Sequence, residues 1–200
     1  MTEPNLRSLL VTEALPPPDV GAQEAVRRTA WHQELVSDLV AEYGGEVLLV
    51  VGRGCVASLP SPGRALDAVT ALVTRRVPQY GDRARIRAAL HLGQVTPHRT
   101  LIAEPGITEA RRLLESAGPT EVVLSAAMRQ ALGQTNLQVA PLASPNGSRT
   151  DPPTGYRVLL NPLSQANEVR GPAVSGWLMA GAVLLAAIAI VGSVTAALLL

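Results

Sequence analysis

The stretch "EVLLVVGRGCVASL", from Glu46 to Leu59, decides the fold. Residues 47–51 and 55–59 are rich in β-branched and apolar side chains, which predicts two strands. The triplet Gly52-Arg53-Gly54 between them predicts a tight turn, so the two strands form a hairpin with Arg53 at its tip. A turn of this kind holds one side chain in a fixed position. Arg53 is therefore either a functional side chain or a residue that replaces one.

The residues around the hairpin predict alternating strands and helices. Before it, residues 9–11 predict a strand that ends at three prolines, and residues 22–43 show apolar residues at helical spacing up to Gly44-Gly45. After it, Ser61 and Pro62 predict the start of a helix over 62–76, and the alternation in 85–95 predicts a strand with one face exposed to water. The remaining elements are predicted as a helix at 107–117, a strand at 121–124, a helix at 125–132, a loop at 141–155 and a closing strand at 156–160. This mixture predicts an α+β sandwich, with helices covering a mainly antiparallel sheet.

Composition excludes several classes of chemistry. All 17 basic residues are arginine, so no phosphate-loop lysine, lysine Schiff base or lysine general base is available. The net charge of +1 provides no basic field, and no nucleic-acid partner is expected. Cys55 is the single cysteine, which excludes an intrachain disulfide and a cysteine-based zinc site and predicts a buried thiol.

The C-terminal residues have a different composition. No charged residue follows Arg170, and the 24 residues from Trp177 to Leu200 are almost all apolar or small. As a helix they would span roughly 36 Å, more than the ~30 Å hydrocarbon core of a bilayer. We expect a domain at 1–162, a linker at 163–172 and a transmembrane helix at 173–200. Arg157 and Arg170, together with an N-terminus unlike a signal peptide, predict a single-pass protein of the cell membrane with its N-terminal domain in the cytoplasm.

Three segments together resemble a known family. These are "ELVSDLVAEYGGEVLLVVGRGCVASLPSPGRALDAVTAL", "RIRAALHLGQV" and "GITEARRLLESAGPTEVVLSAAMRQAL". They resemble, in the same order, the catalytic domain of class III adenylate and guanylate cyclases, over about Leu9 to Leu160. The resemblance implies a ferredoxin-like cyclase sandwich and a head-to-tail dimer with active sites at the interface. In that family one subunit provides two aspartates for two metal ions. The other provides a lysine and an aspartate to the base, plus an asparagine and an arginine to the transition state.

The metal positions of the resemblance fall on Glu13, after the first strand, and on Arg53, in the hairpin turn. A guanidinium has no lone pair for a metal. At ~4 Å and an effective dielectric of 20, its charge opposes a divalent ion by roughly 8 kcal/mol. We therefore expect no bound metal and no cofactor. Apart from the resemblance, Glu13 and Asp19 are expected to be ordinary surface acids.

The other family positions are also changed. The base-reading lysine and aspartate fall on Leu49 and Leu101, and the transition-state asparagine falls on Thr108. The arginine is kept as Arg112, with Arg111 beside it as an alternative by one residue. Apolar side chains cannot hydrogen-bond the edge of a purine, so the resemblance implies a domain that has lost the family's catalytic groups except this arginine.

Three functions remain open. The first is a catalytically inactive cyclase-like domain that serves as a dimerisation or regulatory module, as a homodimer or a heterodimer with another cyclase-like domain. The second is a cyclase subunit that lends Arg112 to a partner, and the third is a metal-independent nucleotide sensor in which Arg53, Arg111 and Arg112 hold a phosphate. The spacing of the three histidines does not indicate a metal cluster, and His91 is expected to be structural.

Overall fold

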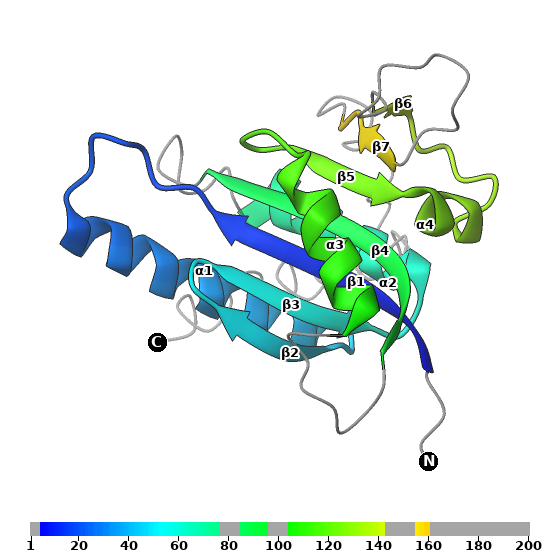
Figure 1. The fold of residues 1–200 in the computed structure, drawn as a ribbon, viewed down its shortest axis with the longest axis horizontal. Helices are drawn as coiled ribbons and strands as arrows, with labels where there is room; N and C mark the ends of the chain where they lie inside the picture. The colour runs from blue at the N-terminus through cyan, green and yellow to red at the C-terminus, as the bar shows by residue number, and fades with distance from the viewer. Residues whose placement is uncertain (1–4, 77–84, 96–103, 143–154, 161–200) are drawn as a thin grey trace, which may run out of the picture. The chain divides into compact units, whose positions relative to one another are not determined.

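The computed structural model describes residues 5–76, 85–95, 104–142 and 155–160, which belong to one compact unit, Met1–Leu160. Figure 1 shows its strands and helices. In chain order they are β1 (Asn5–Ala14), α1 (Ala22–Glu42), β2 (Glu46–Val51), β3 (Gly54–Leu59), α2 (Pro62–Ala71) with a π-helical turn (Leu72–Arg76), β4 (Ile86–Val95), α3 (Pro105–Glu115), β5 (Val122–Ser125), α4 (Ala126–Ala131), β6 (Val139–Pro141) and β7 (Gly155–Val158).

The strands form one seven-stranded sheet in the order β2-β3-β1-β4-β5-β7-β6. β1 lies in its interior and pairs antiparallel with both β3 and β4, whereas β4 and β5 are parallel. The remaining pairs are antiparallel, which confirms the predicted α+β class and mainly antiparallel sheet. β2 lies at one edge of the sheet, so the predicted hairpin borders solvent.

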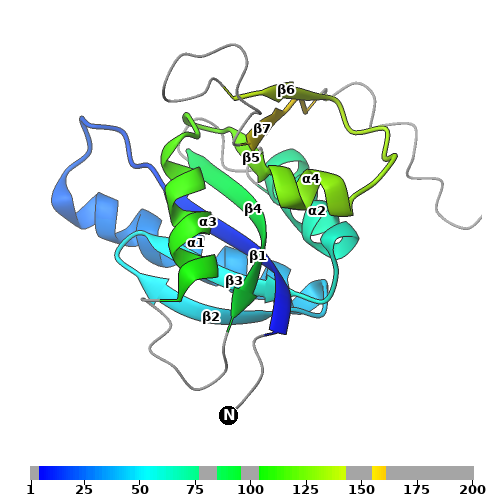
Figure 2. The same ribbon diagram turned by 45° about the vertical axis from the view of Figure 1, so that its right-hand side comes forward.

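Helices cover both faces of the sheet (Figures 1 and 2). On one face, α1, α2 and α4 contribute residues such as Leu39, Val69 and Met128 to a core that includes Leu10 and Leu90 of the central strands. α2 begins as predicted, because the Ser61 hydroxyl accepts a hydrogen bond from the backbone N–H of Arg64.

Of the helices that the structure describes, α3 covers the opposite face. Its residues Ile107, Ala110 and Leu114 pack on a second core that contains Val11 of β1 and Ala89 of β4. The prediction that one face of 85–95 is exposed to water is therefore wrong, since Ala89 is fully buried under α3. The alternation of apolar residues with Arg85, Arg87 and His91 had suggested a wet face, but the small side chain of Ala89 on that face allows α3 to pack on the strand.

Two ends of predicted elements also differ from the structure. Pro141 and Gly155, predicted to bound a loop, belong to β6 and β7, which pair with each other. α3 begins at Pro105, two residues before the predicted start, because proline is favoured at the first position of a helix.

The predicted linker at 163–172 and transmembrane helix at 173–200 lie outside the described residues. Within the part of the chain that the structure describes, none of the helices has both the length and the apolar character needed to cross a membrane.

Candidate functional site

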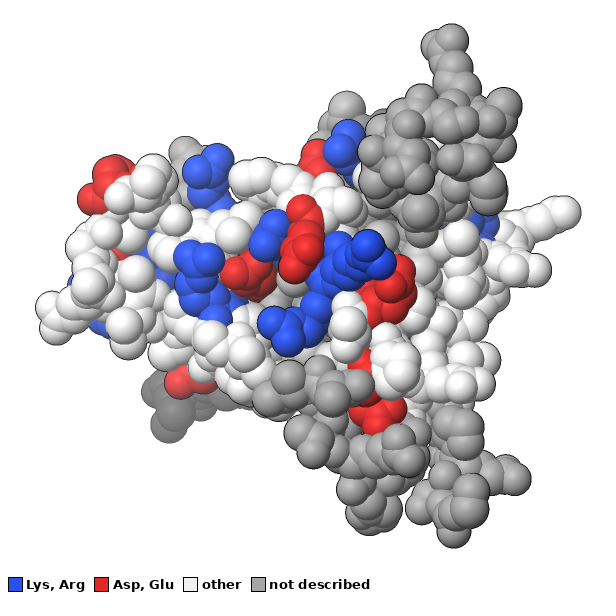
Figure 3. Space-filling view, viewed as in Figure 1, with Lys and Arg blue, Asp and Glu red and all other residues white. Residues whose placement is uncertain are grey.

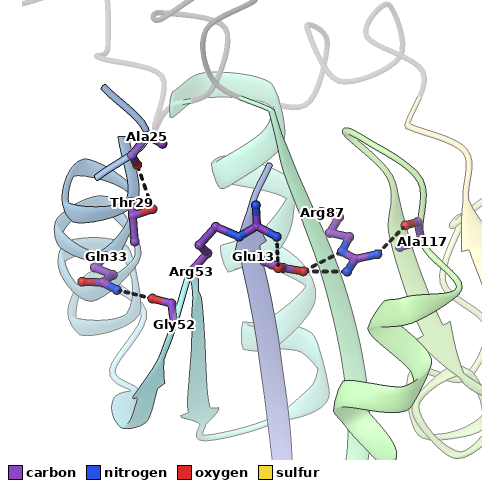
Figure 4. Close-up of polar contacts among 8 residues, drawn as sticks. All are labelled: Glu13, Ala25, Thr29, Gln33, Gly52, Arg53, Arg87 and Ala117. Atoms are coloured by element: carbon purple, nitrogen blue, oxygen red, sulfur yellow. Dashed lines mark hydrogen bonds and ion pairs between the residues drawn. The ribbon is translucent and has the colours of Figure 1, made fainter. Parts of the chain in front are cut away.

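The hairpin turn places Arg53 beside the end of β1. Gly52 adopts a positive φ of 56°, a conformation that glycine reaches without steric cost. The backbone N–H of Ala14 donates to the carbonyl of Arg53 at 3.0 Å, and the Gln33 amide of α1 donates to the carbonyl of Gly52 at 3.2 Å. The turn is thus held from two sides, and the Arg53 side chain extends toward β1 (Figure 4).

Glu13 at the end of β1 lies between two guanidinium groups (Figure 4). The Nη2 atom of Arg53 donates to Glu13 Oε1 at 3.3 Å. On the other side, Nε and Nη2 of Arg87 donate to Glu13 Oε2 at 2.9 and 2.6 Å. The Glu13 side chain is 19% exposed, so the prediction of an ordinary surface acid is wrong. The two positions that the resemblance assigns to metal ligands are in contact, but as an ion pair.

A pocket of about 200 Å³ lies next to this cluster. It is lined by apolar residues of β1, β2, β3 and α3, and by four charged residues: Glu13, Arg87, Arg111 and Glu115. In Figure 3, charged side chains of both signs gather in the middle of the face on which α3 lies. The pocket therefore combines an apolar lining with balanced charges.

The structure brings some of the predicted site residues together and leaves others apart. Leu49 of β2 lines the pocket with Glu13, and so does Arg111, whereas Arg112 is exposed and is not part of the lining. Thr108 is exposed on α3 and does not line the pocket either. Leu101 lies outside the described residues.

The residues of this site do not fit a divalent cation. Both carboxylate oxygens of Glu13 already accept hydrogen bonds from guanidinium groups, and two positive charges flank the carboxylate. Among the described residues, no three His, Cys, Asp or Glu side chains are grouped in a way that could hold a metal ion. Cys55 also lines the pocket, but burial raises the pKa of its thiol to about 11, which keeps it protonated and inert.

Arg87 was missed by the sequence analysis because nothing near it in the chain marks its partner. It lies 74 residues from Glu13, and only the pairing of β1 with β4 brings the two side chains opposite each other. Its Nη1 atom also donates to the carbonyl of Ala117, after α3, at 3.3 Å. Arg87 therefore connects β4 to β1 and to the end of α3.

His32 is a second polar group that the sequence analysis did not assign. It is fully buried, and its Nε2 atom lies 3.0 Å from the hydroxyl of Thr12 in β1. Burial lowers the pKa of His32 to about 4, although the nearby Glu13 acts in the opposite direction. Its place four residues before Val36, in the buried stripe of α1, was a signal that could have identified it.

Comparison with solved structures identifies the fold. The adenylate/guanylate cyclase/hydrolase from Silicibacter pomeroyi is 17% identical, with a TM-score of 0.64 over 80% of this chain and 99% of that chain. The guanylyl cyclase domain of the RhoGC fusion protein from the aquatic fungus Blastocladiella emersonii is similar in a monomeric structure (14% identity, TM-score 0.62, 79% and 98% coverage). It is also similar in a dimeric one (12% identity, TM-score 0.62, 77% and 96% coverage).

No protein-family model matches the chain, and no curated protein matches it. At these identities the structural similarity shows the fold, and that fold is the one predicted from the sequence. The described part of the chain is folded as the catalytic domain of adenylate and guanylate cyclases.

Proposed function

We propose that this chain, which has the fold of the adenylate and guanylate cyclase catalytic domains, has no cyclase activity. It acts instead as an association module. Its partner is a second copy or another cyclase-like domain. We further propose that residues 173–200 anchor the module to the cell membrane, with the folded domain in the cytoplasm.

The observation that carries this proposal is the apolar edge strand β2. Val50 and Val51, on the outermost strand of the sheet, are 49% and 37% exposed. Val51 lies on the pocket side and Val50, the preceding residue of the strand, on the opposite face. An exposed apolar edge strand usually marks a surface that another chain covers, because soluble proteins otherwise protect such edges with charge or proline. β2 has neither after Glu46.

An irregularity in β2 adds to the apolar surface on the α3 side of the sheet. The pairing of β2 with β3 shifts between Val47 and Leu49, and both Leu48 and Leu49 pack against the core under α3. Val51 lines the pocket on the same side. We call Leu48, Leu49 and Val51 the β2 patch. A partner that covers it would bury apolar area beside the charged pocket.

The absence of cyclisation is supported by the same residues. Leu49 offers no hydrogen bond to a purine, and the Glu13–Arg53 pair takes the place of two metal ligands. Attack of a ribose 3′-oxygen on a phosphate builds charge that cations must neutralise. Without a metal site, the cations of the described pocket lining that could face that charge are arginine side chains.

The RhoGC guanylyl cyclase domain has been solved both as a monomer and as a non-canonical dimer, so a domain of this fold can associate without a permanent interface, which supports the proposal. Confinement to one membrane plane would raise the effective concentration of the chain and favour an interface too weak to persist in solution.

The test is association of the full-length chain in membranes, measured by resonance energy transfer between labelled copies. Leu49→Asp and Val51→Asp each place a charge in the β2 patch and should abolish the signal. Val26→Asp is the matched control, because Val26 is 68% exposed but lies on α1. If the two β2 variants, folded by circular dichroism, associate like the control, the association proposal is wrong.

A parallel assay tests the loss of chemistry. The purified chain should form no cyclic nucleotide from ATP or GTP with Mg²⁺ or Mn²⁺. Turnover that disappears in Arg112→Ala, but not in Arg64→Ala on the exposed surface of α2, would instead show that the chain works as a cyclase subunit.

A second candidate, a metal-independent nucleotide sensor, is favoured by one observation. The Arg111 side chain lines the pocket and makes no hydrogen bond or ion pair with another described residue. Saturable binding of a non-hydrolysable ATP analogue in the presence of EDTA, lost in Arg111→Ala, would support the sensor. No binding under these conditions would eliminate it.

A further inference from the structure

The resemblance places the two metal-binding aspartates at Glu13 and Arg53, and the structure adds a second guanidinium group, that of Arg87, beside them. Each oxygen of that carboxylate accepts at least one hydrogen bond: Oε1 from Arg53, and Oε2 twice from Arg87. Neither carboxylate oxygen of Glu13 is therefore free of a cationic donor.

We infer that Glu13, Arg53 and Arg87 form an internal ion cluster in which the chain's own guanidinium groups take the place of divalent cations. This end of the sheet is therefore ordered without any metal ion. The inference does not depend on association with a partner.

The cluster joins several segments of the chain. Arg53 belongs to the β2–β3 turn, Glu13 to the end of β1 and Arg87 to the start of β4. Arg87 also reaches the carbonyl of Ala117, which follows α3. One carboxylate thus ties together the strand ends and the helix end that surround the pocket, as a bound cation would do with several carboxylates.

The charge of the cluster also excludes a divalent cation. Two guanidinium groups against one carboxylate leave the cluster with a net charge of +1 at neutral pH, and a divalent cation would be repelled by both arginines. The cluster therefore takes the place of a metal ion, and its positive charge opposes the binding of one.

The two arginines also bind Glu13 with different strength. Arg87 binds through two nitrogens and is 22% exposed, whereas Arg53 binds at 3.3 Å through one nitrogen and is 51% exposed. A partly buried pair with two short hydrogen bonds to one carboxylate oxygen is stronger than an exposed pair with a single longer contact. We expect Arg87→Met to lower the unfolding midpoint more than Arg53→Met.

The experiment measures thermal unfolding of the full-length chain in mild detergent, with MnCl₂ or with EDTA. The wild type should unfold at the same temperature in both. The double variant Arg53→Asp/Arg87→Met removes both guanidinium groups and adds a carboxylate beside Glu13. Mn²⁺ should raise its midpoint by about 3–6 °C at roughly ten times the dissociation constant.

Arg53→Asn/Arg87→Met is the matched control, because asparagine has the shape of aspartate without its charge, and its midpoint should not rise in this way. The inference is overturned if Mn²⁺ stabilises the wild type, or if the Asp and Asn variants respond alike.

A double-mutant cycle keeps the inference testable even if those variants do not fold. Glu13→Gln and Arg87→Met remove the two sides of the stronger contact singly and together. Their shifts in unfolding midpoint should be non-additive, with the double variant falling little further than the worse single variant. Additive shifts would mean that the two side chains are not coupled and would also overturn the inference.

Discussion

Lowering the pH should destabilise the domain through His32. The side chain is buried between α1 and β1, and burial lowers its pKa to about 4, from the 6.5 of an exposed histidine. The unfolded chain therefore binds a proton at a higher pH than the folded one. The stability gained from a neutral His32 is fully present above about pH 6.5 and is lost as the pH falls toward about 4.

The size of the effect follows from the two pKa values. Between about pH 7.5 and about pH 5, the linkage relation gives a loss of about 2 kcal/mol from this one group. For a domain of this size, that corresponds to a fall in the unfolding midpoint of about 4–8 °C. Urea unfolding of the full-length chain in detergent at both pH values measures the free energy directly.

The variant His32→Gln identifies the source of the pH dependence. Glutamine keeps a polar partner for the Thr12 hydroxyl but cannot gain a proton, so its loss of stability between the two pH values should be smaller than that of the wild type by about 2 kcal/mol. His91→Gln is the comparator, because burial also lowers the pKa of His91 and this histidine contributes in the same direction. If His32→Gln keeps the full pH dependence of the wild type, His32 is not the buried neutral group described above.

Three further outcomes are expected. Gly106→Ala should lower the free energy of unfolding by about 1–2 kcal/mol, because the added Cβ would lie 2.5 Å from the carbonyl oxygen of Gln94. Gly63→Ala is the control, since Gly63 also follows a proline at a helix start. Its added Cβ would meet only the Ser61 hydroxyl, at 4.0 Å, and the free energy of unfolding should not change. Thr120→Asn should raise the free energy of unfolding by roughly 0.5–1 kcal/mol, since Thr120 has a φ of 62° and asparagine tolerates that conformation better, and an unchanged urea midpoint would contradict this. Truncation after Asn167 should move the chain from the membrane to the soluble fraction, and equal partition of both forms would show that the tail is not the anchor.

The parts of the fold that depend on local chemistry were predictable. The β2–β3 hairpin follows from two β-branched runs around glycines, and the start of α2 follows from Ser61 and Pro62, whose cap the structure confirms. β6 was missed because its three residues are a strand only through pairing with β7, and Pro141 suggested a loop.

The site was predictable only in part, for a similar reason. The position of Arg53 at the tip of a turn follows from its neighbours, but its partner does not. Glu13 is separated by 40 residues from Arg53 and by 74 from Arg87 along the chain. The three side chains come together only because β1 pairs with β3 and β4. The buried face of β4 was missed because only the docking of α3 covers Ala89.

The central claim is that the chain associates through the β2 patch, and site-specific crosslinking tests it most directly. The native Cys55 is buried and its pKa is raised to about 11, so it should not react with a maleimide. A cysteine introduced at an exposed position would therefore be the thiol that reacts. Val51→Cys in membranes should form a crosslinked dimer with a short bismaleimide, and adding Leu49→Asp should remove it. Val26→Cys, more exposed but on α1, should give none. Equal crosslinking at both positions, or none at Val51→Cys, would contradict the claim.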